Sequence, residues 1–496
     1  MPVDTPSEKY KYMLPIWTKA RVATKGQHAV KLARTDYLPC SAGYEEAWYE
    51  GTWQRAYWYG ATGATVESYQ GAIFRKNPVL TPELKDTSED QQELLQSVDN
   101  NDNDLVTFST NVTNDMLQTS YGGILVDHDN TDGKILTQEQ VKAINKRARI
   151  IYYPAESIIN ATKDQIRLSE VYNESTDEFT EEIKYQIKVL DVQKYQNQGR
   201  ELKRYRQRIF RKKDDSDDEF EQFGNDFFPE LTPGVFFEEI PFQFIGAKNN
   251  DLNPDSPILE GLVNANFQHY GLYSDMREAL HWIRPFIYQT GYQKPPDGEQ
   301  SVQVINPNVM LTAGPDSNYG ILEFRGSGLQ WDYKTLELLE SQMSSMGADA
   351  LKGQKRSAES ADKARIDKSS EASVLATLAN NISSAITISL NIMMKWNGED
   401  TDFVFQLNTD YDATSFDAQL LTALNKSNES GNMSQRTVIW NQKKGELLPD
   451  GVSVDDEINQ IDAEASGLGN QEQLTELITN IIESMKDEGG EENMTS

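Results

Sequence analysis

Two acidic clusters in this 496-residue chain hold enough carboxylates to suggest a divalent metal site. One is Asp127-His128-Asp129 with Asp132, and the other lies at 214–218. Carboxylate oxygens are the ligands Mg²⁺ prefers, and paired metal ions serve nucleases. The first cluster, however, falls in a turn rich in Gly and Asn, and the second falls in a continuous charge run. Solvated loops are therefore the favoured interpretation of both, and we expect no resident metal.

Other catalytic signatures are weak in the sequence. Gly60-Ala61-Thr62-Gly63 lacks the lysine that a phosphate-binding loop needs, and no G-x-S-x-G elbow occurs. Cys40 is the only cysteine, so one chain can form neither an internal disulfide nor a cysteine-based zinc site. None of the four histidines forms an i, i+4 pair. We therefore expect no catalytic residue, no cofactor and no enzymatic activity.

Basic residues gather in three segments. The segment from Lys146 to Arg149 is short, and we expect it to lie on the surface of the protein. Residues 200–213 contain eight basic residues and one acidic residue, and residues 214–221 add six acids. This alternation predicts oppositely charged strands or a hairpin that pairs with itself or with a neighbouring subunit, in preference to a nucleic-acid contact. Residues 352–368 hold six basic and three acidic residues, a net charge of +3.

The whole chain has a formal net charge of −31. Phosphate binding requires neutralisation by Lys or Arg, so the chain either avoids nucleic acid or handles it without adhering to it. No targeting segment is apparent at the N-terminus. The least polar stretch, 374–394, is interrupted by Asn and Ser residues, which predicts a packed helix and no membrane partner.

Periodicity divides the chain into helical and strand regions. Residues 1–80 are rich in aromatic residues and predict packed helices. Residues 150–245 alternate at period two, as in an antiparallel sheet. Apolar residues at three- and four-residue spacing predict helices over 257–281, 333–346 and from about 357 to 396. Asp255-Ser256-Pro257 would cap the first of these. Residues 411–496 are predicted to be helical and very acidic.

Eight short segments, in this order, resemble those of tailed-bacteriophage portal proteins. The most specific is 153–160, Tyr-Pro-Ala-Glu-Ser-Ile-Ile-Asn. The helix running to Tyr288-Gln289-Thr290-Gly291 is similar to a family helix that ends in a Thr-Gly turn. The remaining segments are 121–127, 240–246, 369–375, 407–411, 433–437 and 445–451. Each match is modest alone, and their shared order along nearly the whole chain carries the resemblance.

The resemblance implies an α+β portal fold with an α/β wing, a helical stem, a small β-containing clip and an α-helical crown. Such proteins form a ring, usually of twelve subunits, at a capsid vertex of the virion, after assembly in the host cytoplasm. The implied parts are the wing at 1–256, the first stem helix at 257–284, the clip at 285–331, the second stem helix at 332–346, the tunnel loop at 347–368, the tunnel-side helix and wing return strand at 369–410, and the crown with its acidic tail at 411–496.

The implied partners are double-stranded DNA in the channel, terminase, head–tail adaptor or tail proteins, and the major capsid and scaffolding proteins. An acidic channel wall would repel phosphate and let DNA slide. A ring of basic loops, which Gly347 and Gly353 would let flex, would then make transient backbone contacts. The expected DNA-facing residues are Lys352, Lys355, Arg356, Lys363 and Arg365.

Two other classes remain open at this point. A different structural head–tail adaptor of the virion would also assemble into particles, although such subunits are usually much shorter. A soluble acidic enzyme, such as a metal-dependent nuclease, would use the acidic clusters. Ring imaging separates the portal from both, and metal-dependent DNA cleavage would favour the enzyme.

The first prediction concerns Lys352, Lys355 and Arg356. Replacing all three with Glu should reduce the yield of particles holding full-length genomes several-fold, because the loop would then repel phosphate. The length of packaged DNA measures this, with imaging to verify that rings still form. Packaging equal to the parent would mean that these residues instead pair with Glu359 and Asp362 along a helix.

Overall fold

The computed structural model describes most of the chain and divides it into two units, 1–411 and 412–496. The described residues are 2–40, 43, 45–99, 101–128, 147–175, 181–197, 200–213, 219–232, 234–282, 286–290, 318–322, 328–347, 361–411, 418–444, 447–448 and 453–464. Lys352, Lys355, Arg356 and Gly353 lie outside them, as do Asp129, Asp132 and residues 214–218 of the acidic clusters.

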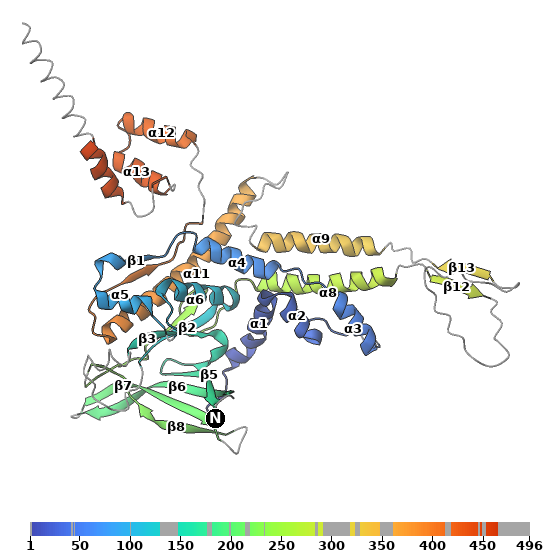
Figure 1. The fold of residues 1–496 in the computed structure, drawn as a ribbon, viewed down its shortest axis with the longest axis horizontal. Helices are drawn as coiled ribbons and strands as arrows, with labels where there is room; N and C mark the ends of the chain where they lie inside the picture. The colour runs from blue at the N-terminus through green and yellow to red at the C-terminus, as the bar shows by residue number, and fades with distance from the viewer. Residues whose placement is uncertain are drawn as a thin grey trace, which may run out of the picture. The chain divides into compact units, whose positions relative to one another are not determined.

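The first unit begins with helices, as the aromatic-rich sequence predicts (Figure 1). Leu105, Phe108, Val112 and Met116 form the buried stripe of α6, and the Asp104 carboxylate caps that helix by accepting from Thr107 N at 2.8 Å. The helical elements of this region are α1 (Glu8–Lys25), α2 (Gln27–Leu32), η1 (Arg34–Asp36), α3 (Glu46–Arg55), α4 (Ala61–Ile73), η2 (Leu84–Asp86), α5 (Glu89–Gln96) and α6 (Leu105–Thr119).

Two antiparallel sheets come next, which confirms the strand region predicted from alternation. A three-stranded sheet has the order β11-β2-β3, and a five-stranded sheet has the order β4-β5-β6-β7-β8. The strands are β2 (Tyr121–His128), β3 (Ala148–Pro154), β4 (Ile158–Ala161), β5 (Gln165–Ser175), β6 (Glu181–Asn197), β7 (Arg200–Lys212), β8 (Phe220–Phe227) and β11 (Phe242–Gly246), with η3 (Ala155–Ser157) between β3 and β4. A small pair, β9 (Glu230–Thr232) with β10 (Val235–Phe236), precedes β11.

Three of the sequence segments that resemble portal proteins meet at the smaller sheet. Segment 121–127 supplies β2, segment 240–246 supplies β11, and segment 153–160 supplies the end of β3, η3 and the start of β4. The glycines of β2 are required by packing across strands. A Cβ on Gly122 would lie 2.5 Å from the Tyr152 hydroxyl, and one on Gly123 would lie 2.3 Å from the Phe242 ring. The motif thus encodes close contact between strands and aromatic rings.

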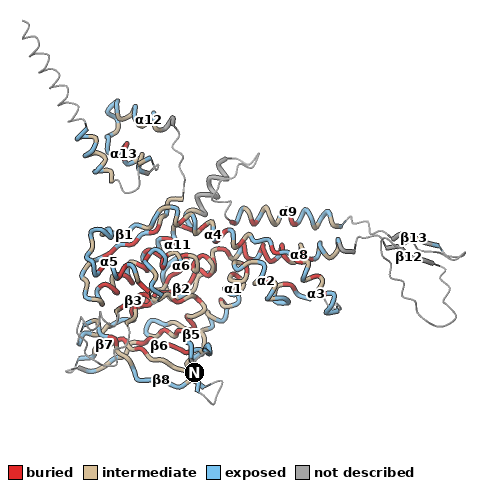
Figure 2. The backbone as a smooth tube through the Cα atoms, viewed as in Figure 1, coloured by how far each residue is buried: buried red, intermediate tan, exposed pale blue. Residues whose placement is uncertain are grey.

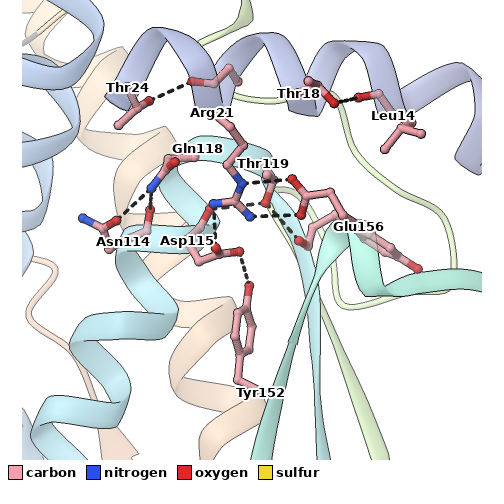
Figure 3. A network of polar contacts seen from close by, with 12 residues as sticks. Leu14, Thr18, Arg21, Thr24, Asn114, Asp115, Gln118, Thr119, Tyr152 and Glu156 are labelled. Atoms are coloured by element: carbon pink, nitrogen blue, oxygen red, sulfur yellow. Dashed lines mark hydrogen bonds and ion pairs between the residues drawn. The ribbon is translucent and has the colours of Figure 1, made fainter. Parts of the chain in front are cut away.

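An arginine whose side chain is 17% exposed fixes α1 to this sheet (Figure 3). The Arg21 guanidinium donates to both carboxylate oxygens of Glu156, at 2.9 and 3.1 Å, and lies 2.6 Å from Asp115 Oδ1. The Tyr152 hydroxyl donates to Asp115 Oδ2 at 2.7 Å. The bidentate contact with Glu156, which belongs to segment 153–160, suits the planar guanidinium. Helix α1, helix α6 and strand β3 are therefore held by one charge cluster.

Helix α11 (Ala361–Trp396) runs through the main core, where it packs on α6, β2, β3 and β11. Among the described residues, 372–396 is the single stretch with the length and mean hydropathy, 1.3, of a membrane span. Half of that stretch is buried inside the protein, with Leu378, Ile382, Ile386 and Leu390 fully enclosed. The stretch is thus a packed core helix, as predicted.

The polar residues that interrupt α11 bond to the backbone of β14 (Val404–Gln406), which also pairs with β1 (Val79–Thr81). Leu407 N donates to Ser383 Oγ at 2.9 Å, Phe405 N to Thr387 Oγ1 at 3.0 Å, and Phe403 N to Asn391 Oδ1 at 2.7 Å. Four residues of helix rise about 6 Å and two residues of strand about 6.6 Å, so the two spacings match. Helix α11 therefore closes the free edge of this small sheet.

After β11 the chain forms an arm. Helix α8 (Glu260–Trp282) leads out, β12 (Phe286–Thr290) and β13 (Asn318–Leu322) pair, and α9 (Leu329–Met346) returns. Helix α8 begins at Glu260, later than predicted, and the Asp255 carboxylate that was expected to cap it accepts from Lys248 N at 2.8 Å. The end of α8 at Trp282 agrees with the helix predicted from periodicity over 257–281, whereas the helix that the resemblance extends to Thr290 is wrong, since 286–290 form a strand.

The second unit is described by itself. Its helices are α12 (Ala418–Glu429) and α13 (Gln435–Lys444), and residues 454–464 are also helical. Segment 433–437, one of the portal-like segments, contains Ser434, whose hydroxyl accepts from Thr437 N at the start of α13. Val438 and Ile439 form its buried face. The described part of this unit is helical, as predicted.

The second prediction uses Thr387, at which valine replaces the hydroxyl group with a methyl group. Thr387→Val should lower the free energy of unfolding by about 1–3 kcal/mol, because Phe405 N–H loses its acceptor in the interior. Chemical denaturation measures this. Thr377→Val on the exposed side of the same helix, where the hydroxyl bonds only Ser373 O, is the control. Equal stabilities for the two variants would contradict the role assigned to Thr387.

Candidate nucleic-acid interface

The segment with the expected DNA-facing residues joins α9 to α11, so these helices determine where it starts and ends. The two arm helices are antiparallel. His269 of α8 lies 3.2 Å from Glu340 of α9, and Gly261 of α8 faces Met346 near the other end. The buried His269 ring also stacks on Tyr273 at 5.9 Å. The basic segment therefore begins at the end of α9 nearest the core.

Gly347 is a fixed packing point at this position, which corrects the expectation that it lets the loop flex. Its backbone is extended, with φ −120°, and the residue is buried. A Cβ here would lie 2.6 Å from Thr65 Oγ1 of α4 and 3.6 Å from Leu262 of α8. Glycine is needed because α4 and α8 approach closely.

At the other end, α11 starts at Ala361, so the last part of the expected tunnel loop is helical. Lys363 and Arg365 lie in the first two turns of α11, and residues 348–360 fall outside the described residues. The periodicity, which predicted a helix from about residue 357, is closer to the structure than the loop limits taken from the resemblance. The DNA-facing role of Lys352, Lys355 and Arg356 therefore remains a prediction from sequence. Lys363 and Arg365, the other two expected residues, lie on a helix.

The second basic segment, 200–213, forms strand β7, and its arginines have partners within the sheet. Arg206 and Arg208 both contact the buried Asp191 carboxylate of β6, and Arg206 Nη1 also lies 2.8 Å from Asp226 of β8. The Arg204 guanidinium stacks 3.7 Å from the Phe228 ring centroid. Strand β7 does pair with β8 as a hairpin, but these partners lie outside the acidic run 214–221 that was expected to supply them.

Arg211 also has partners within the sheet. Its guanidinium lies 3.7 Å from the Phe223 ring centroid and 4.1 Å from the Tyr172 ring centroid. Cation–π contacts of this kind satisfy arginine without phosphate. The sequence signal for this arrangement was the alternation of basic and apolar residues, but the aromatic partners come from other strands.

The first basic segment is less exposed than expected. The Arg147 side chain is 12% exposed, its Nη2 donates to Ser97 O at 3.0 Å, and Ala148 is fully buried. Asn397, just after α11, binds both backbone groups of Ala148, at 2.9 and 3.0 Å. Interior contacts with α5 and the end of α11 thus explain this segment, and the surface interpretation of Arg147 is wrong.

Asp127, from the first acidic cluster, lies in strand β2 with a side chain that is 13% exposed, so the solvated-loop interpretation is wrong for this residue. Its carboxylate accepts from Lys188 Nζ, from Gln207 Nε2 at 2.7 Å and from His128 N at 2.9 Å. Burial by itself would raise the pKa of Asp127, but these three donors hold it below the usual value. The carboxylate joins the two sheets and is already saturated with donors. Among the described residues, no group of three or more His, Cys, Asp or Glu is placed to hold a metal ion.

The comparisons with known proteins match parts of this arrangement. A family model described as a domain of unknown function (DUF4055) matches residues 258–397, which run from the start of the arm to the end of α11. The match spans under a third of the chain. No curated protein matches the sequence.

Two solved structures are similar at low identity. A chain from the neck of an empty GTA particle is 10% identical, with 79% of this chain and 91% of that chain covered and a TM-score of 0.39. A chain from the virion of a native gene transfer agent (GTA) particle is 10% identical, with 84% and 98% covered and a TM-score of 0.37. TM-scores this low do not define a shared fold, so function must be inferred from the chain's own residues.

The third prediction tests the basic strand β7. Replacing Arg206 and Arg208 with Met should lower the free energy of unfolding by about 3 kcal/mol, because Asp191 would be left buried without a cation. Denaturation measures the loss, with Lys203→Met, exposed on the same strand, as control. If these arginines bound phosphate instead, the double variant would bind DNA with a smaller salt dependence, and the slope of log K against log salt would fall by about two.

Proposed function

We propose that the chain is a subunit of a bacteriophage portal ring, a conduit for double-stranded DNA at one vertex of the capsid. The observation that carries the proposal is the path of the chain through the arm. It leaves the core along α8, forms the β12–β13 pair, returns along α9 and re-enters the core as α11. This is the order of stem, clip, stem and tunnel-side helix that the sequence resemblance implies.

The attachment of the β12–β13 pair supports this interpretation. Three residues separate Trp282 of α8 from Phe286 of β12, and six separate Leu322 of β13 from Leu329 of α9. The pair is therefore tied to the outer end of two antiparallel helices, as a clip is tied to a stem. The first unit beyond the arm, with its two sheets and α1 to α6, would be the wing, and the second unit the crown.

The charge distribution supports a conduit over a DNA-binding protein. Arg206 and Arg208 of β7 and Arg147 have partners inside the fold, while the chain carries a net charge of −31. A ring of such subunits would present mostly acidic surface to DNA and so resist tight binding. Residues 352–365 would then give weak, sequence-independent contacts. Packaging energy would come from a separate terminase, and adaptor or tail proteins would bind at the β12–β13 end.

The fourth prediction is that the purified full-length chain forms closed rings with a central hole, usually of twelve subunits. Electron microscopy with symmetry counting tests it, together with sedimentation at micromolar concentration over a range of salt. A stable monomer under all these conditions would contradict the proposal.

Assembly of phage particles with and without this chain distinguishes a portal from an adaptor. DNA enters through a portal, so particles assembled without this chain should be empty. Particles that lack only an adaptor would already contain DNA. DNA-filled heads formed without the chain would therefore favour the adaptor function.

A further inference from the structure

The arm exposes more apolar surface than its own packing uses. On α9, Leu336 and Met343 are buried against α8, but Trp331 is 70% exposed and Leu338 is 58% exposed. Tyr333 is also 58% exposed. Figure 2 shows exposed residues recurring along α9. Trp331 and Leu338 are seven residues apart and so share one side of α9, and we take this side of the helix as a candidate interaction surface.

Helix α8 lies between two different surfaces (Figure 1). Helix α9 packs on one of its sides, and α1 and α3 pack on the other, where Phe267 and Tyr270 meet Trp58 in an aromatic cluster. Helices α1 and α2 also expose apolar residues, Tyr12 at 73% and Leu32 at 69%. Helix α9 and the α1–α2 pair therefore lie on opposite sides of α8.

These two surfaces carry opposite charge. Helices α8 and α9 together have six acidic and two basic residues, a net charge of −4. Helices α1 and α2 have six basic and one acidic residue, a net charge of +5. Arg21 is paired inside the fold, but Lys25, at the end of α1, is exposed. The α1–α2 surface is thus a basic region in a chain with a net charge of −31.

The acidic charge of the arm is poorly compensated inside one chain. Burial raises the pKa of Asp275 on α8, and the nearby carboxylates of Glu278 and Asp332 raise it further. Asp332 belongs to α9, so like charges meet where the two arm helices pair. A cationic surface placed beside the arm would relieve this repulsion.

We propose that the partner of the α9 surface is the α1–α2 surface of a second copy of this chain. Trp331 and Leu338 of one copy would pack against the region of Leu32 on the next, with Glu337 facing the basic residues around Lys25. The two surfaces differ and lie on opposite sides of α8, so the contact is head-to-tail and repeats around a ring. This inference rests on the proposed function, because it assigns the contact by which the ring closes.

The fifth prediction uses two variants of the full chain, each with one surface disabled at exposed positions. Glu337→Lys with Leu338→Lys disables the α9 surface, and Lys25→Glu with Leu32→Glu disables the α1–α2 surface. For each variant alone, the fraction of chains found in rings should be at least ten-fold lower than for the parent, as measured by sedimentation and electron microscopy. Val171→Lys, exposed on β5 far along the sheet, is the control and should form rings like the parent.

Mixing the two variants gives the sharper result. Each mixed pair retains one intact contact, and at the second contact the introduced Lys residues of one variant face the introduced Glu residues of the other. The mixture should therefore form one-to-one pairs that neither variant forms alone. Rings from either variant alone, a stable dimer of one variant with itself, or disassembly by Val171→Lys would overturn the assigned contact. A monomeric parent would instead overturn the proposed function. Near-equal thermal unfolding of all variants and the parent verifies that the changes act on association.

Discussion

The hydrogen bonds between α11 and β14 are the constraint on which the arrangement depends. A helix as apolar as 372–396 must be enclosed, and the enclosing elements must have their backbone groups satisfied. Ser383, Thr387 and Asn391 solve both problems, because they point from an apolar helix to the edge of β14. With that edge closed, α11 can pass through the core and connect it to the basic segment and the arm.

Much of this architecture could be predicted from the sequence, since local patterns determine it. The helical spacing of α8 and α9, the alternation in β5 to β7 and the polar interruptions in α11 all led to the correct element types. The clustering of portal-like segments in one sheet was not visible, because strand order depends on contacts across more than a hundred residues.

The errors share a physical cause, which is that the decisive partner lies far away in sequence or in an unexpected place. Asp255 looked like a helix cap but bonds Lys248 N, and Gly347 looked like a hinge but is pressed between α4 and α8. Arg147 looked exposed but is enclosed near α5 and Asn397. For charged residues in particular, a local count of basic residues says little, because β7 and residues 352–368 look alike until strand pairing satisfies the first of them.

The charge pattern of the arm also bears on which assemblies are possible. Two copies meeting through α9 alone would bring acidic surfaces together, and two copies meeting through α1–α2 would bring basic surfaces together. Both arrangements are opposed by repulsion, although each would bury apolar area. Only the unlike surfaces attract, and they lie on opposite sides of α8. Like-charge repulsion would therefore disfavour symmetric dimers and favour the head-to-tail contact, which is the one that can close into a ring.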